Sequence, residues 1–265
     1  LGALFSFMTY VMAALSYKSL ALYPIAYTRM LLVELASSFA SKLAPAGAGG
    51  LAVNTRFLTK NHHTLTQAGS IAGINNLMGL FGHMSILLTL LLLGSTSVRQ
   101  AFNVKISLPT WFWLLVGVML LGLIIFVFAK RMYRHKAVQI VKGIHDTLVD
   151  YRQYPFRLIG SYGASILITL SYATTLYLSA LALGQGITPL QTIVVFTVGV
   201  AAASITPTPG GIGGAEAGLA AALTGAGLTP EKAISVALLY RFLTYWLPII
   251  PGFTAFQFAS RKEYI

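Results

Sequence analysis

The chain has 265 residues, of which 56% are hydrophobic and only 9% are charged. Soluble globular domains carry about 25% charged residues, so this composition excludes an ordinary soluble domain and indicates an integral membrane protein. The formal net charge is +12. Because the basic residues cluster beside apolar segments, a positive-inside bias explains the charge better than nucleic-acid binding does. The chain has no cysteine, which excludes disulfides and cysteine chemistry.

Seven apolar segments are candidates for membrane helices, each of which needs roughly 20 apolar residues. They cover residues 1–16, 27–44, 68–93, 110–129, 158–183, 189–206 and 233–256. The chain begins at Leu1, already inside the first segment, and we expect the natural N-terminus to lie upstream. The segment 110–129 carries no charge, and its Trp111 and Trp113 are typical of interfacial anchors.

Two Pro-Gly motifs interrupt apolar sequence at corresponding positions. The first contains Pro45, Gly47, Gly49 and Gly50, and the second contains Pro209, Gly210, Gly211, Gly213 and Gly214. A single offset of 164 residues places proline on proline and three glycines on three glycines. Such breaks are tolerated in a membrane only where the freed backbone groups are buried in protein or line a wet cavity. Paired breaks in two halves of a chain point to the substrate site of a transporter-type protein.

The segment 130–157 is the most basic part of the chain, with seven Lys and Arg residues. We place it in the cytoplasm by the positive-inside rule. Apolar residues recur within it at helical spacing. This pattern fits either an amphipathic helix on the inner leaflet or an ordinary solvated helix.

The remaining basic residues bear on how 27–60 and 189–226 are arranged. If each is a re-entrant hairpin broken at its Pro-Gly motif, most basic residues that flank them fall on the cytoplasmic side, as the positive-inside rule favours. Three full spans then separate the hairpins, so the second enters from the opposite face.

We therefore predict an all-α integral membrane protein, a polytopic helix bundle with two Pro/Gly-broken re-entrant hairpins in an inverted repeat. The whole chain, 1–265, forms one transmembrane domain, with repeat halves at about 17–129 and 156–265. The predicted location is a membrane that the chain crosses several times.

Charged residues within the apolar segments are the main functional candidates, because intramembrane charges are costly. They are Glu34, Lys42, Arg56, Glu216 and Arg241. A guanidinium can donate two parallel hydrogen bonds to a phosphate, so Arg241 and Lys42 are predicted to meet an anionic head group, with Glu216 positioning Arg241. The alternative is that Arg241 only holds helices together as a buried partner of Glu216.

Two further residues, Tyr240 and Asn75, belong to the predicted site. Asn75 and Asn76 fall opposite Leu239 and Tyr240 at the repeat offset. The asparagines either line the cavity or hydrogen-bond across helices. No nucleophile–base pair and no set of metal ligands can be assembled from the sequence, so we predict no catalytic residue, no cofactor and no metal site.

The second motif carries a family resemblance. Residues 206–216 have the sequence TPTPGGIGGAE and are followed by ALLYR at 237–241 and by Pro251-Gly252. Together with Glu34 and Lys42-x-x-Pro45 in the first half, these motifs resemble the lysylphosphatidylglycerol synthase transmembrane family. The resemblance extends over most of the chain.

The resemblance implies an inner-membrane protein built from inverted repeats. In the multiple peptide resistance factor of this family, the module moves aminoacylated phosphatidylglycerol toward the outer leaflet, and relatives act on other lipids, including lipid-linked sugars. The synthase of the family is a separate soluble domain, so we expect this chain not to be an enzyme.

The leading functional prediction is a flippase-like translocase for an anionic or aminoacylated phospholipid or a lipid-linked sugar. The alternatives are an ion-coupled small-solute transporter, in which Glu34 and Glu216 carry protons, and a non-transporting membrane subunit of a lipid-modifying enzyme. An integral-membrane transferase is a weaker fourth. The expected partners are membrane phospholipid and either a second copy or a lipid-modifying enzyme, and no nucleic acid is expected.

Overall fold

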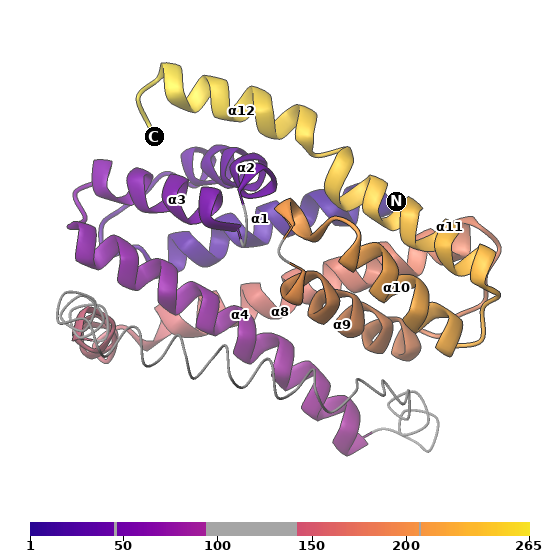
Figure 1. Cartoon of the computed structure of the whole chain (residues 1–265). Coiled ribbons are helices and arrows are strands. Elements are labelled where there is room, and N and C mark those ends of the chain that lie inside the picture. Colours follow the sequence, from indigo (N-terminus) through magenta and orange to yellow (C-terminus); the bar gives the residue numbers. More distant parts are fainter. Residues whose placement is uncertain (45–46, 94–141, 207) are drawn as a thin grey trace, which may run out of the picture.

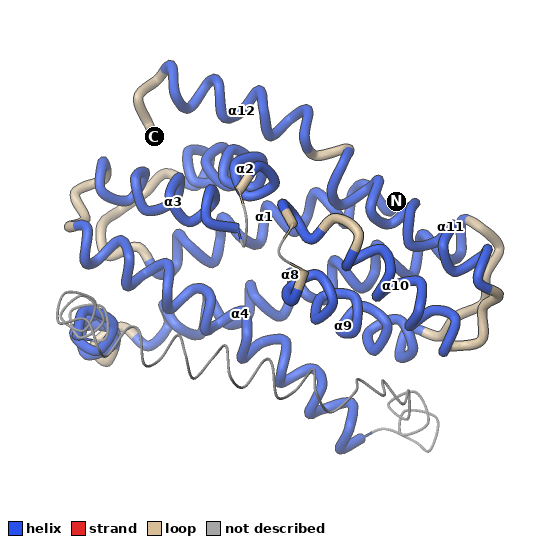
Figure 2. The backbone as a smooth tube through the Cα atoms, in the orientation of Figure 1, coloured by secondary structure: helices blue, strands red, loops and turns tan. Residues whose placement is uncertain are grey.

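The computed structural model describes residues 1–44, 47–93, 142–206 and 208–265, and within these ranges all regular structure is helical (Figures 1 and 2). The elements are α1 (Gly2–Leu20), α2 (Tyr27–Leu43), α3 (Ala48–Lys60), α4 (Leu65–Leu93), α8 (Pro155–Ala182), α9 (Pro189–Ile205), η2 (Pro209–Gly211), α10 (Gly214–Gly225), α11 (Pro230–Arg241), η3 (Phe242–Trp246) and α12 (Ile249–Arg261). The predicted all-α class is confirmed for these residues.

Three of the described helical stretches are long and apolar enough to cross a membrane. They are Leu65–Leu90, Pro155–Ala182 and Pro230–Arg261. The stretch Pro189–Ser204 is apolar but shorter. These helices support the predicted integral membrane protein. The predicted span 110–129, the basic residues 130–141 and Pro45 of the first break lie outside the described residues.

The buried apolar residues form two clusters, one in each half of the molecule. The first joins α1 to α2, α3 and the start of α4, with Phe57 and Ile71 among its fully buried side chains. The second joins the later part of α8 to α9, α10 and α11, around Leu176 and Leu223. The long helices α1 and α8 pack along each other and connect the two halves (Figure 1).

In the first half, α2 precedes the first break and α3 follows it. The two helices pack closely against each other. A Cβ atom at Gly49 would overlap the backbone carbonyl oxygen of Ala40, so only glycine permits this approach. The hydroxyl of Ser37 donates to the carbonyl oxygen of Gly50 at 3.2 Å. Small residues therefore let the two helices meet directly after the chain reverses.

In the second half, α9 and α10 run antiparallel on both sides of η2. Gly214 faces Thr206 and Gly218 faces Ala202, so the two helices pack through small residues. Between them, Gly210 has φ 61°, a conformation in which a side chain on an L-residue is strained. The glycines of the second motif thus supply both the reversal of the chain and the close packing that follows it.

The chain after α11 passes through a π-helical turn, η3, before α12. The amide of Leu247 donates to the carbonyl oxygen of Phe242 at 2.8 Å, five residues back. Pro248 and Pro251 follow, and neither has an amide hydrogen for the helical ladder. Single π-helical turns are often found at functional sites, and this turn places Thr244 and Tyr245 beside the cavity described below.

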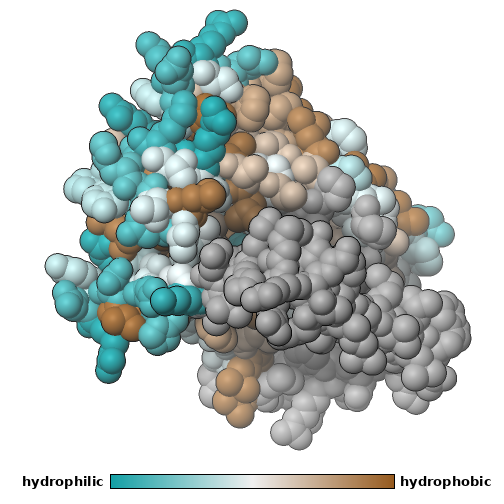
Figure 3. All heavy atoms as spheres, turned by 60° about the vertical axis from the view of Figure 1, so that its left-hand side comes forward, coloured by the Kyte–Doolittle hydropathy of each residue, from teal (hydrophilic) through white to brown (hydrophobic). Residues whose placement is uncertain are grey.

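The basic segment is described from residue 142, and residues 142–151 are helical. Tyr151 is fully buried, and its hydroxyl donates to the carbonyl oxygen of Leu20. Gly143 packs against Thr66 at the start of α4. This stretch therefore docks on the ends of α1 and α4. Figure 3 brings the left-hand side of Figure 1 forward. In this view the hydrophilic residues gather on the left of the molecule.

Candidate functional site

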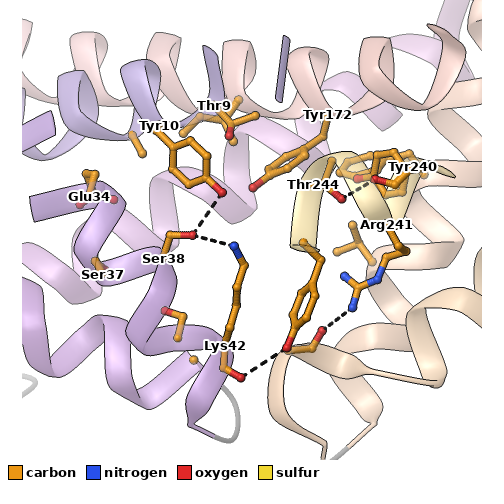
Figure 4. A pocket seen from close by; sticks show the side chains of 18 residues that line it. Thr9, Tyr10, Glu34, Ser37, Ser38, Lys42, Tyr172, Tyr240, Arg241 and Thr244 are labelled. Atoms are coloured by element: carbon orange, nitrogen blue, oxygen red, sulfur yellow. Dashed lines mark hydrogen bonds between the residues drawn. The ribbon is translucent and has the colours of Figure 1, made fainter. Parts of the chain in front are cut away.

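The helices on both sides of each break form two helix pairs, α2 with α3 and α9 with α10. A polar cavity of about 450 Å³ lies between these two helix pairs (Figure 4). Its lining residues come from both halves, and they include Tyr10, Glu34, Ser38, Lys42, Gly47, Tyr172, Gly210, Tyr240, Arg241, Thr244 and Tyr245. Gly47 belongs to the first break and Gly210 to the second. The structure therefore brings both Pro-Gly motifs to one cavity, which we call the central cavity.

Arg241 is fixed at this cavity by the second break. Its Nε donates to Oε1 of Glu216 at 2.7 Å, and its Nη2 donates to the carbonyl oxygen of Gly210 at 3.0 Å. The other carboxylate oxygen of Glu216 accepts from the amide of Gly213 at 2.8 Å, at the N-terminus of α10. The side chains of Arg241 and Glu216 are only 11% and 22% exposed. The guanidinium is thus held in one orientation while it lines the cavity.

The ring of Tyr245 lies near both cationic side chains of the cavity. The guanidinium carbon of Arg241 is 4.4 Å from the ring centroid, and Nζ of Lys42 is 5.5 Å from it. Both distances fall in the range of cation–π attraction. The Tyr245 hydroxyl also donates to the carbonyl oxygen of Lys42 at 3.4 Å. This one side chain therefore links the end of α2 to the π-helical turn.

Lys42 enters the cavity from the last turn of α2. Its Nζ donates to the hydroxyl of Ser38 at 3.2 Å, and Ser38 donates to the hydroxyl of Tyr10 at 3.1 Å (Figure 4). Among the described residues, the ion pairs are His145–Asp146 and Arg241–Glu216, and neither includes Lys42. The ammonium group of Lys42 is thus held by the neutral hydroxyl of Ser38 and faces the cavity without a carboxylate partner from this part of the chain.

A second cavity of about 350 Å³ adjoins the central one on the side of α3 and α4. The two share Glu34, Ser37, Ser41 and Gly47. The second cavity is also lined by Tyr17, Ala48, Gly50, Leu51, Asn54, Asn75 and Asn76. Ser16 on α1 donates to Oδ1 of Asn75 at 2.6 Å. Asn75 thus both bonds across helices and lines a cavity, the two alternatives that its position in the sequence left open.

A third, apolar cavity of about 180 Å³ lies on the other side of Tyr10. It is lined by Ala3, Ser6, Phe7, Tyr10, Leu35, Leu243, Leu247, Pro248 and Pro251. Tyr10 lines both this cavity and the central one. A polar and an apolar space therefore meet at one side chain.

The remaining predicted site residues are less central. Arg56 is exposed on α3 and does not line the central or the second cavity. Gly50 lines the second cavity, Gly49 lies in the α2–α3 contact, and Gly211 is buried in the second break. Pro209 begins η2, and Gly213 and Gly214 begin α10.

Several lining residues were not anticipated from the sequence. They are Thr9, Tyr10, Ser37, Ser38, Ser41, Asn54, Tyr172, Thr244 and Tyr245. A usable signal was present in α2, where Glu34, Ser37 and Ser41 recur at helical spacing within an apolar segment and so form a polar stripe. Tyr245 follows Arg241 by four residues, which also places the two side chains on neighbouring helix positions.

Fold and site together define a polytopic helical membrane protein with a cationic cavity between two broken helix pairs. Residues 1–252 match the family described as the lysylphosphatidylglycerol synthase TM region, and the chain belongs to this family. The resemblance carried by the second Pro-Gly motif is thereby confirmed.

Two relatives indicate the range of proteins that share this region. The chain is 27% identical over 216 residues to a phosphatidylglycerol lysyltransferase of Staphylococcus haemolyticus. The matched region covers 81% of this chain and 23% of that protein. The chain is also 36% identical over 91 residues to a UPF0104 membrane protein of Pyrococcus horikoshii. That matched region covers 34% of this chain and 25% of that protein. Each match thus spans about a quarter of the relative's length.

Proposed function

We propose that the protein is a lipid translocase that moves an anionic or aminoacylated phospholipid, or a lipid-linked sugar, between leaflets. The observation that carries the proposal is the central cavity, where Arg241 from one half and Lys42 from the other face the same space. Arg241 is a fixed fork of donors and Lys42 is a point charge without a carboxylate partner among the described residues. This pair suits the phosphate of a lipid head group.

The apolar cavity favours a lipid over a soluble solute. It adjoins the central cavity at Tyr10 and is lined almost wholly by apolar side chains. A head group in the central cavity would thus have an apolar space beside it for part of an acyl chain. The relative from Staphylococcus haemolyticus is named for phosphatidylglycerol, which supports a phosphatidylglycerol-type lipid as the substrate class.

The two broken helix pairs are the proposed moving parts. Each is a re-entrant hairpin that returns to the face from which it enters, and the two form an inverted repeat around the cavity. In this arrangement the pairs alternately open the central cavity to each side. The protein lies in the cell (inner) membrane with 130–157 in the cytoplasm, and its partners are membrane phospholipid and either a second copy or a lipid-modifying enzyme.

The test is a reconstituted transport assay with fluorescent phosphatidylglycerol. We expect the purified protein to speed movement between leaflets over empty liposomes, and Arg241→Ala to remove most of this acceleration. Arg152→Ala is the matched control, because Arg152 is exposed and lies outside both polar cavities. Absence of acceleration by folded wild-type protein would reject the translocase. Equal rates for Arg241→Ala and wild type would reject the assignment of the site.

A second candidate is a non-transporting membrane subunit of a lipid-modifying enzyme. It is favoured by the relative named as a lysyltransferase, a protein about four times longer than the matched region. Co-purified phospholipid without leaflet transfer is the result that this candidate predicts. A third candidate is an ion-coupled solute transporter with Glu34 and Glu216 as proton carriers. Of these two residues, Glu216 is already engaged by Arg241 and Gly213.

A further inference from the structure

Two residues that line the second cavity each have a buried side-chain oxygen without a hydrogen-bond partner. Among the described residues, Oε1 of Glu34 and Oδ1 of Asn54 are the buried side-chain atoms left unpaired. The two residues are only 8% and 4% exposed, and both line this cavity. Most buried polar atoms are paired with protein, water or an ion. Two unpaired acceptors on one cavity therefore point to a bound partner that supplies positive charge or donors.

The second cavity offers Glu34 no countercharge. Its lining contains one carboxylate, no Lys, Arg or His, and six amide or hydroxyl side chains, which are Tyr17, Ser37, Ser41, Asn54, Asn75 and Asn76. Lys42 lines the central cavity instead, where its ammonium group donates to Ser38. In Figure 4, Glu34 lies on the side of the central cavity away from Arg241. An ionised Glu34 thus has no basic partner among the residues that line the second cavity, and an unpaired buried charge is strongly unfavourable.

We propose that the second cavity binds a monovalent cation through the carboxylate of Glu34 and Oδ1 of Asn54. Oxygen ligands of this kind suit small hard cations. A single carboxylate balances a single positive charge, whereas a divalent ion would leave one charge uncompensated. The described residues contain no group of three or more His, Cys, Asp or Glu side chains that could hold a metal ion, so a transition metal does not fit this site.

Two sources can supply this chemistry, an inorganic ion such as Na⁺ or the primary ammonium group of a bound molecule. The two cavities share Glu34, Ser37, Ser41 and Gly47. A cation at Glu34 therefore lies next to the space that Lys42 and Arg241 line, and either source can be used together with an anion bound there. The cation site stands without the proposed lipid transport, since its binding is measured on the protein alone.

The experiment follows thermal unfolding of the purified, detergent-solubilised protein at constant ionic strength. Choline chloride is the reference salt, because its quaternary ammonium has no N–H donor and is bulky. It is replaced stepwise by sodium chloride in one arm and by methylammonium chloride in the other. We expect a saturating rise in Tm in at least one arm for the wild type, and no such rise for Glu34→Gln. Glu231→Gln is the matched control, since Glu231 is exposed and lines neither polar cavity, and it should respond as the wild type does.

The outcomes separate the sources and can overturn the proposal. A rise with sodium alone assigns an inorganic ion, and a rise with methylammonium alone assigns the ammonium group of a ligand. A rise with both identifies a site that accepts either. No rise with either salt, or an undiminished rise in Glu34→Gln, would overturn the cation site. If Glu34→Gln does not fold, Asn54→Ala decides, because losing one ligand should raise the half-saturating concentration roughly tenfold or more, and an unchanged value would reject the site.

Discussion

Arg241 makes contacts in two directions. Toward α10 it forms the ion pair with Glu216 and bonds the carbonyl oxygen of Gly210, which fastens the last part of the chain to the second break. Toward the cavity it lies over the ring of Tyr245, beside Lys42. A residue of this kind can be structural and ligand-binding at once. The two roles are separable because only the first needs Glu216.

A double-mutant cycle on Arg241 and Glu216 measures the structural part. We expect Arg241→Ala and Glu216→Ala each to lower stability, because each leaves a half-buried charge without its partner. The coupling energy should be about 1.5–3 kcal/mol, the range for hydrogen bonds between charged groups. Thermal or denaturant unfolding of the four proteins provides the measurement. A coupling energy of roughly 0.5 kcal/mol or less, as for an exposed pair, would show that the pair does not fasten the second break.

The charged residues of the site could be predicted from the sequence, and most neutral ones could not. Lys42, Glu216 and Arg241 are conspicuous because a charge in an apolar segment is costly and needs a reason. Tyr10 and Tyr245 give no such signal, since tyrosine is common at membrane interfaces and in helix packing alike. Their place beside Lys42 depends on how α1, α2 and η3 pack, which no local pattern contains.

At the scale of elements, the glycine breaks explain how α2 and α3 can meet. Gly49 and Gly50 stand where the two helices are closest, against Ala40 and against Ser37 and Ser41. The contact at Gly49 is with backbone, which cannot move aside as a side chain can. The first break therefore depends on the absence of a side chain at this position as much as on the helix-breaking tendency of glycine.

Gly49→Ala should thus destabilise the protein by about 1–3 kcal/mol, the usual cost of overpacking. Gly69→Ala is the matched control, because Gly69 lies in α4 with nothing within 4 Å of an added Cβ. There, alanine should be neutral or stabilise by up to about 1 kcal/mol through its higher helix propensity. The difference in Tm between the two variants is the measurement. Equal effects would mean that α2 and α3 are not in contact at Gly49.

Among the elements, the breaks could be located from the sequence, whereas the π-helical turn could not. Proline and glycine mark a reversal directly, and both motifs lie at one cavity as their paired positions suggested. The segment 233–256 was predicted as one span, and it lies within the stretch Pro230–Arg261, which is long and apolar enough to cross a membrane. The π-helical turn at Phe242–Trp246 inside this stretch was not predicted. An inserted residue that produces a π-helical turn changes the hydrogen-bond register without changing composition, so hydropathy does not detect it.

At the scale of the molecule, the ends of each helix pair lie close together. Arg29 at the start of α2 packs on the ring of Tyr264, and Lys60 at the end of α3 donates to the carbonyl oxygen of Glu263 at 2.7 Å. Gln191 at the start of α9 lines the same small cavity as Ala226 after α10. Each pair therefore returns the chain to the end at which it began.

The long helix α8 separates these two ends. Arg157 in its first turn donates to the carbonyl oxygen of Ala21, near the start of α2. The whole helix has 28 residues, which is about 42 Å at 1.5 Å per residue, and its far end leads into α9. This length supports entry of the second pair from the face opposite to the first, as the proposed inverted repeat requires.

Single-cysteine labelling tests this arrangement, and the cysteine-free chain needs no prior substitution. Ala26→Cys and Leu65→Cys flank the first pair, and Gly186→Cys and Thr229→Cys flank the second, all at exposed positions. We expect a membrane-impermeant maleimide to label the first two from one face and the last two from the other, because each pair returns to its own side. The measurement compares right-side-out with inverted vesicles. Labelling of two flanks of one pair from opposite faces would mean that this pair crosses the membrane, and labelling of all four from one face would exclude the inversion.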